Sequence, residues 1–338
     1  MKKLLLIALS AFVFTACSTN QETLKPQNEI ANIGDALVEQ AFPNKQGQVA
    51  KGYFGIRPVS YEIVDGQYVT EGDIILDGSR ISSTPQNLGN LGIQGESVGR
   101  TSGRWPNNIV YYNIDSNLPN QSRVTDAIAH WEANTNISFQ VRTNQSNYIT
   151  FRVGGGCSSS VGMVGGRQYI NLASGCSTGN TIHEIGHAVG LWHEHTRADR
   201  DNDVTIHFNR IQSGKEHNFQ TYVQRGADGD EYTSSLDFGS IMMYPSSAFS
   251  NNGQPTITKK DGSTFGAQRD GLSSGDISGI NQMYPASNGG GGGEPTYENN
   301  RWYTIDGLRV YRYNNKWYYH NGSQWREVVN INGTWYYA

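Results

Sequence analysis

The sequence is poor in cysteine, in charge and in long apolar runs, and each shortage excludes a class of protein. Its three cysteines lack partners at the spacing of zinc ligands, which argues against a cysteine-ligated metal site. Lysine and arginine number 26 against 30 acidic residues and form no basic block, so nothing indicates a nucleic-acid partner. Charged residues make up only 17%, whereas glycine (40) and tyrosine (19) are abundant, which favours a loop-rich protein with strands over a helical bundle. The 338 residues suffice for more than one domain.

The apolar run at the N-terminus is too short to span a bilayer in the mature protein and is typical of an export signal. Two lysines precede it, and it extends from Leu4 to Phe14. The small residues before Cys17 resemble a bacterial lipoprotein signal, which predicts a signal peptide over residues 1–16 and a lipid on the Cys17 thiol. The alternative is an ordinary secretory signal with an incidental cysteine. In both cases we expect a secreted or cell-surface protein, and the lipid would tether the precursor to a membrane.

Three histidines and a glutamate stand at the spacing of a catalytic zinc site. His183 and His187 are four residues apart, so a helix places both on one face. Glu184, beside the first ligand, can hold a water molecule at the metal. Gly190 can adopt backbone conformations that other residues resist, which lets the chain leave the helix and return His193 as a third ligand. Three protein ligands leave one coordination position open, which is typical of catalytic rather than structural zinc.

The same region resembles the astacin family of metzincin metalloproteases. Metzincins carry HExxHxxGxxH followed by a Met-turn, and here Ser240–Tyr244 reads SIMMY. Glu194 directly after the third histidine, and Tyr244 two residues after Met242, are similar to astacins, especially bacterial, flavastacin-like members. Met243 replaces the family's usual histidine, and the chain lacks the cysteines for the family's second disulfide. The resemblance runs from about Trp105 to Tyr284 and includes Thr196–Asp201, Glu216–Phe219, Ala248–Gly253, Gln268–Ser273 and Ile280–Tyr284.

The resemblance implies a zinc-dependent endopeptidase that acts on proteins or peptides. One Zn²⁺ would be bound by the three histidines, Glu184 would be the general base, and Tyr244 would move from the metal to the oxyanion. Met242 would form an apolar floor under the histidines, and Glu194 would receive the new N-terminus after activation. The alternative is a catalytically inactive zinc scaffold that binds surface glycans through a C-terminal module.

Cys157 and Cys176 form an even pair in a protein that leaves the cytoplasm. The astacin family has a disulfide at the matching positions, so the resemblance implies a bridge, and two free thiols are the alternative. A closed loop of roughly 20 residues would stabilise the fold by about 3 kcal/mol in the chain-entropy model.

Residues 17–97 are polar, with stretches rich in glycine, asparagine and glutamine, and they are expected to form a propeptide. They contain the sequence EGD, which ends at Asp73. Astacin propeptides carry a similar Phe-x-Gly-Asp segment whose aspartate binds the zinc, although Thr70 stands at the phenylalanine position here. By this resemblance Asp73 would be the zinc ligand of the zymogen, and a simple turn between two strands is the alternative. The segment has no cysteine except Cys17, which argues against a thiol block of the zinc.

Residues 98–285 are expected to form an α+β catalytic domain of two subdomains, as in astacin-like metzincins. Alternating apolar residues predict strands, and apolar residues at helical spacing predict helices. The expected elements are strands near 109–112, 137–141 and 149–153, helices over 121–134 and 273–284, and a zinc helix that begins near Thr178.

Beyond the catalytic domain, residues 286–293 are a glycine-rich linker and residues 294–338 an aromatic-rich β module. Similar phrases around Trp302, Trp317 and Trp335 indicate a short internal repeat. The aromatic faces could stack on sugars, or the rings could simply pack a small sheet that lacks a larger core.

Two basic residues predict the specificity. Lys215 precedes the EHNF phrase and Arg269 follows Gln268. Astacin-family members with basic residues at these places use them in the pocket for the residue after the scissile bond. Two cations in a partly desolvated pocket would favour a carboxylate, so we expect cleavage before Asp and then Glu. The alternative is that both side chains are solvated surface charges.

Overall fold

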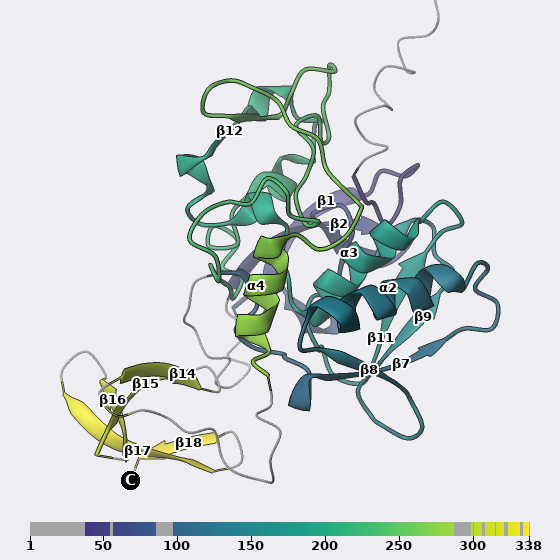
Figure 1. The fold of residues 1–338 in the computed structure, drawn as a ribbon. Coiled ribbons are helices and arrows are strands. Elements are labelled where there is room, and N and C mark those ends of the chain that lie inside the picture. The colour runs from purple at the N-terminus through teal and green to yellow at the C-terminus, as the bar shows by residue number, and fades with distance from the viewer. Residues whose placement is uncertain are drawn as a thin grey trace, which may run out of the picture.

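The computed structural model describes residues 38–54, 57–85, 97–286 and, with short gaps, 299–337. The predicted signal peptide, Cys17 and most of the glycine-rich linker lie outside these ranges. In the described part no helix is both long and apolar enough to cross a membrane. Figure 1 shows an N-terminal sheet in purple, the catalytic region in teal and green, and a C-terminal sheet in yellow.

The catalytic region begins with a five-stranded sheet in the order β10-β11-β9-β7-β8. Its strands are β7 (Ile109–Ile114), β8 (Ser138–Val141), β9 (Tyr148–Arg152), β10 (Cys157–Ser158) and β11 (Arg167–Leu172). β10 is antiparallel to β11, and the other neighbouring strands are parallel. Ile149 and Phe151, two residues apart on β9, are both fully buried because alternate side chains of a strand share a face.

Two helices pack together on this sheet and share its core. They are α2 (Ser122–Asn134) and α3 (Thr178–Val189). The indole nitrogen of Trp131 in α2 donates a hydrogen bond to the carbonyl of Ile182 in α3 at 3.1 Å, which fixes the second helix against the first. Val124, Ala127, Ile128 and Trp131 recur at helical spacing on α2 and are all buried in this core.

After α3 the chain is mostly irregular and builds a second core. The short strands β12 (Val204–Ile206) and β13 (Ile257–Lys259) pair antiparallel. The helix α4 (Ser274–Met283) returns to the first core through Ile280 and Met283. The second core includes Val204, Phe219, Tyr244, Phe249 and Ile257. The 3₁₀ turns are η1 (Gly78–Arg80), η2 (Pro106–Asn108), η3 (Glu194–Thr196), η4 (Arg200–Asn202), η5 (Phe208–Arg210) and η6 (Glu216–Phe219).

Each predicted strand and helix of this domain occurs within two residues of its expected limits. The mixture of a sheet, helices and two separate cores confirms an α+β domain.

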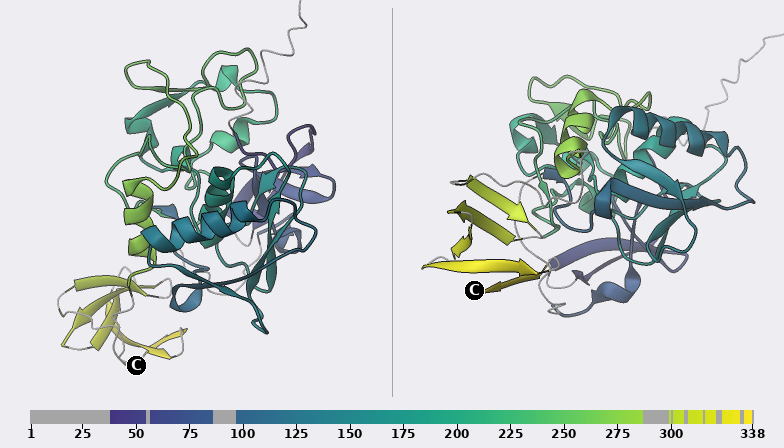
Figure 2. Two further views of the ribbon diagram at one scale, coloured as in Figure 1. Left: turned by 45° about the vertical axis from the view of Figure 1, so that its right-hand side comes forward. Right: turned by 60° about the horizontal axis from the view of Figure 1, so that its bottom comes forward.

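The N-terminal segment forms its own five-stranded sheet in the order β4-β3-β2-β1-β5. Its strands are β1 (Gln48–Phe54), β2 (Arg57–Val64), β3 (Gln67–Thr70), β4 (Ile74–Leu76) and β5 (Ile81–Ser82). At the turn before β4, Glu71 and Gly72 both have positive φ values of 50° and 82°. The sheet meets the catalytic sheet where Ile75 donates to the Ser159 carbonyl at 2.8 Å and Ser159 donates to the Asp73 carbonyl at 3.0 Å. Figure 2 shows the purple strands lying against the teal catalytic region in both views.

A short strand, β6 (Ser97–Gly99), follows the N-terminal sheet in the chain and precedes the five-stranded sheet of the catalytic region. The C-terminal module is an antiparallel meander of β14 (Arg301–Ile305), β15 (Leu308–Tyr313), β16 (Lys316–His320), β17 (Trp325–Ile331) and β18 (Thr334–Tyr337). Trp317 packs edge-on against Tyr303 and Trp335, with ring centroids 5.6 and 5.9 Å apart, and all three rings are half-buried. Trp325 and Tyr337, by contrast, are 50% and 58% exposed.

Candidate metal centre

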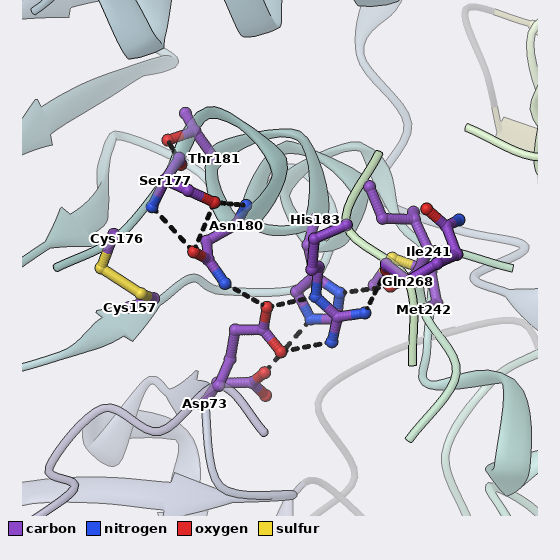
Figure 3. Close-up of polar contacts among 12 residues, drawn as sticks. Asp73, Cys157, Cys176, Ser177, Asn180, Thr181, His183, Ile241, Met242 and Gln268 are labelled. Atoms are coloured by element: carbon purple, nitrogen blue, oxygen red, sulfur yellow. Dashed lines mark hydrogen bonds and ion pairs between the residues drawn. A yellow bond between two sulfur atoms is a disulfide. The ribbon is translucent and has the colours of Figure 1, made fainter. Parts of the chain in front are cut away.

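The helix that carries the first two histidines is capped at both ends. Ser177 and Asn180 form a capping box that satisfies the free backbone N–H groups of the first turn, as Figure 3 shows. The disulfide Cys157–Cys176 joins β10 to the residue before this cap. At the other end Gly190 has a φ of 116°, a left-handed conformation that favours glycine, and the chain turns back there as the sequence predicted.

The three histidines converge on Asp73. Nε2 of His183 and Nε2 of His193 lie 3.2 and 3.3 Å from Oδ2 of Asp73, and Nε2 of His187 lies 3.6 Å from Oδ1. All four side chains are fully buried. Figure 3 shows Asp73 approaching His183 from the N-terminal segment, below the helix that carries the histidine. Asp73 therefore lies in the turn between β3 and β4, and its side chain also reaches the three histidines.

The second nitrogen of each histidine is fixed by an acceptor. Nδ1 of His183 donates to the Ile241 carbonyl, and Nδ1 of His187 donates to the Leu191 carbonyl, both at 2.8 Å. Nδ1 of His193 donates to the Glu71 carboxylate at 2.8 Å. A proton on each Nδ1 leaves the lone pair of each Nε2 free for a metal.

Unpartnered atoms test whether zinc fits this site. Nε2 of His187, Nε2 of His193 and Oδ1 of Asp73 are buried without a hydrogen-bond partner. Ligand atoms around tetrahedral zinc, with bonds of about 2.05 Å, lie roughly 3.3 Å apart. The distances from Asp73 to the three histidine nitrogens, 3.2 to 3.6 Å, lie near that value, and the four ligand atoms lie within 4.8 Å of one another, so the four residues fit one Zn²⁺.

Glu184 stands beside the cluster without any partner. Both oxygens of its carboxylate are buried and accept no hydrogen bond. Burial, together with the nearby Asp73 and Glu39 carboxylates, raises the pKa of Glu184 well above its usual range. A buried carboxyl group without a structural partner is typical of a functional site.

Met242 and Tyr244 of the Met-turn both pack at the site, with different neighbours. Met242 packs so closely against Gly186 that a Cβ there would lie 2.8 Å from the Met242 sulfur. The Tyr244 ring stacks on His195 with centroids 4.0 Å apart and lies 4.5 Å from the His193 ring. The Tyr244 hydroxyl donates to the carbonyl of Glu71 in this structure.

Glu194 is buried next to the site and accepts a hydrogen bond from the Asp237 backbone N–H at 2.8 Å. Burial raises the pKa of Glu194 to about 8. A small cavity is lined by Glu194 and Asp276 and by the apolar Val98, Leu191 and Met242, among others.

Both basic residues chosen from the sequence hold carboxylates of the N-terminal segment. Arg269 forms an ion pair with Glu39, which also accepts from the Asn180 amide at 2.6 Å. Lys215 forms an ion pair with Glu62 at 2.5 Å. Neither cation is a solvated surface charge here, because their side chains are 15% and 12% exposed.

Sequence reasoning missed the acidic partners Glu39, Glu62 and Glu71, and also Arg225. Arg225 forms an ion pair with the fully buried Glu71. Although burial alone would raise it, Arg225 and His193 together lower the pKa of Glu71 to about 2. Glu71 stands two residues before Asp73, and this was the only sequence feature that could have pointed to it. Nothing in the sequence linked Glu39 to Arg269 or Glu62 to Lys215.

These features are typical of one class of protein. Three histidine ligands on one helix and the turn that follows it form the kind of zinc centre that metzincin metalloproteases carry, and Asp73 from the N-terminal segment adds a fourth ligand here. The chain belongs to the astacin family of peptidases, because the family described as Astacin matches residues 97–285.

Known relatives cover the same part of the chain. The chain is 39% identical over 206 residues to flavastacin of Elizabethkingia meningoseptica, covering 57% of this chain and 45% of flavastacin. It is 40% identical over 198 residues to blastula protease 10 of Paracentrotus lividus, covering 54% of this chain and 32% of that protein. Among solved structures, high choriolytic enzyme 1, a hatching enzyme zinc-protease from Oryzias latipes, matches with a TM-score of 0.51 and 30% identity, over 58% of this chain and all of that one. The match spans less than half of either curated relative.

Proposed function

We propose that this protein is an exported, zinc-dependent endopeptidase that is made as an inactive precursor. The observation that carries the proposal is the unpartnered carboxylate of Glu184 beside the cluster of His183, His187 and His193. Catalysis needs a general base that is free to accept a proton next to the metal, whereas a scaffold does not. This argues against the alternative of an inactive zinc scaffold.

Zinc, when bound, supplies a Lewis acid that polarises the scissile carbonyl and lowers the pKa of water. Glu184 takes a proton from the attacking water and passes it to the leaving nitrogen, so the C–N bond breaks as a neutral amine departs. Tyr244, once released from the Glu71 carbonyl, donates its hydroxyl to the oxygen on which negative charge develops. Met242 keeps the underside of the site apolar through its contact with Gly186.

The precursor is silent because Asp73 fills the position that substrate needs. Its carboxylate lies within 3.6 Å of all three histidines, and it leaves no room there for water or a peptide carbonyl. The positive φ values of Glu71 and Gly72 aim the turn into the site. Removal of the segment that ends near residue 97 would open this position.

Cleavage would also create an N-terminus close to Glu194. Val98 lines the cavity beside that carboxylate, so a new ammonium group near Val98 is within reach of Glu194 and Asp276. An ammonium group there would favour the charged form of Glu194 and pair with it. This supports cleavage between about Gly92 and Ser102.

The acidic preference is supported by what the N-terminal segment places on the two cations. Glu39 occupies Arg269 and Glu62 occupies Lys215. A cleft that binds carboxylates of its own propeptide would bind those of a substrate, so cleavage before Asp and then Glu stays our prediction.

Export and attachment belong to the same proposal. Cys17 would carry the lipid of a membrane-held precursor, although it lies outside the described residues. Cleavage after the propeptide would then free a soluble enzyme. The exposed Trp325 and Tyr337 of the C-terminal module support a glycan contact.

A direct test is hydrolysis of a denatured protein by the processed enzyme. We expect cleavage with zinc present, loss with a chelator and recovery when zinc is returned. Mass spectrometry of the products separates internal cleavage from trimming of the ends. Binding of zinc without any cleavage would contradict the proposal and favour the scaffold.

A further inference from the structure

Arg225 is a buried cation whose partner comes from the propeptide. Its side chain is 4% exposed, and its ion pair is with Glu71, which is fully buried. Two of its nitrogens, Nε and Nη2, have no hydrogen-bond partner. The guanidinium lies over the ring of Trp192, 5.0 Å from the centroid.

The catalytic domain offers Arg225 no acid of its own in the part of the chain that the structure describes. Asp228, three residues further on, pairs instead with Arg100 at 3.1 Å. When the propeptide leaves, Arg225 therefore loses the counter-ion that it has in the precursor. A buried charge without a partner is costly, so a ligand that restores a carboxylate would be favoured.

The Glu71 carboxylate is bound from two sides. Its contacts therefore indicate what kind of ligand could replace it. Arg225 binds one oxygen, and Nδ1 of His193 donates to the other at 2.8 Å. A planar carboxylate with one oxygen for each donor satisfies both. Since His193 is a zinc ligand, such a carboxylate belongs to a residue close to the scissile bond.

The two other cations in the cleft give the precedent. Arg269 and Lys215 also hold propeptide carboxylates, from Glu39 and Glu62, and the proposed specificity already assigns both cations to substrate. Arg225 likewise binds a propeptide carboxylate, that of Glu71, which lies two residues before Asp73.

We propose that Arg225, the Nδ1–H of His193 and the face of Trp192 form a further carboxylate-binding subsite of the processed enzyme. It takes an Asp or Glu side chain of the peptide substrate, at a position other than the one that Arg269 reads. This rests on the proposed endopeptidase function. The enzyme thus selects clustered acidic residues rather than a single one.

Cleavage-site profiling of the processed, zinc-loaded enzyme on a peptide library tests the subsite. We expect a second acidic position in the wild type, with kcat/KM about tenfold higher for Glu than for Gln there. Arg225→Gln should abolish that ratio and leave both the choice at Arg269 and the hydrolysis of uncharged peptides within about threefold. Arg225→Glu should shift the second position toward Lys and Arg. The matched control is Arg167→Gln, an exposed arginine on β11, which should change nothing.

A binding measurement keeps the test independent of turnover. In the processed Glu184→Ala protein, an acidic peptide should bind about tenfold tighter than its Gln counterpart, and Arg225→Gln should remove the difference. Cleavage without a second acidic position, or a position that survives Arg225→Gln, would overturn the subsite and leave the protease function standing. A processed wild type that cleaves no peptide would overturn both.

Discussion

The N-terminal sheet and the catalytic domain differ in what they bury. The catalytic domain has a continuous core that includes Trp131, Ile149 and Phe151. The N-terminal sheet has a cluster of only Ala41, Val64 and Val69. Its larger contacts are with its neighbour: Ile74 joins Val98, Val161 and Trp192 of the catalytic domain. A segment with so small a core depends on the surface it covers for its order.

The two regions also bring opposite charge to their contact. The N-terminal segment supplies Asp73, Glu39, Glu62 and Glu71, and the catalytic domain supplies three imidazoles and three cations. Each buried charge is compensated across the boundary, so removing one side leaves the other uncompensated. The contact is therefore stable as a whole, and we propose that the cations exposed when the segment leaves favour acidic substrates.

The largest expected effect comes from the catalytic side. Glu184→Ala should lower peptide hydrolysis by the processed enzyme roughly 10⁴-fold, because it removes the general base. Zinc content should stay at one per chain, since Glu184 is not a ligand. Turnover and metal analysis on one preparation check this, with Glu184→Gln as the isosteric control. Near-normal turnover of the zinc-loaded variant would refute the mechanism.

The second prediction concerns the acidic residues of the N-terminal segment. Asp73→Ala should give an uncut precursor that hydrolyses peptide, because the position at the metal becomes free. The control is Asp77→Ala, whose carboxylate caps the exposed 3₁₀ turn that begins at Gly78. The measurement is activity of precursor that remains uncut on a gel. If Asp73→Ala is as silent as uncut wild type, the aspartate switch is wrong.

The third prediction concerns the contribution of the disulfide to the stability of the catalytic domain. Replacing Cys157 and Cys176 by serine should lower the free energy of unfolding by about 3 kcal/mol, because the unfolded chain regains the entropy of an open loop. Urea unfolding of the processed enzyme measures it, with and without a reductant as the control. An unchanged midpoint would mean that the bridge contributes no stability.

The smallest effect concerns a single cation. Arg269→Gln should weaken the preference for an acid after the scissile bond by about 2 kcal/mol, the value of a charged hydrogen bond in a buried site. Library profiling decides it, with the exposed Lys260→Gln as the matched control. An unbiased or hydrophobic preference in the wild type would remove this specificity and leave the protease function intact.

Much of the catalytic domain could be predicted because local patterns encode it. The helix spacing of α2, the alternation of β9 and the glycine after α3 each depend on residues a few positions apart. The position of Asp73 at the histidines came from a family resemblance, since 110 residues separate it from His183. No periodicity spans such a distance.

The sequence by itself determined the zinc ligands, since His183, His187 and His193 are placed by helix geometry and one left-handed glycine. The cysteine bridge was implied by the family resemblance, with two free thiols as the alternative, and the structure shows the bridge. Only the tertiary structure decided which acid meets which cation. Glu39 and Arg269 are 230 residues apart, and Glu71 reaches Arg225 and His193 through a turn whose direction depends on the sheet pairing around it. Ion pairs of this kind form where folded surfaces bring charges together, and charge alone does not specify a partner along the chain.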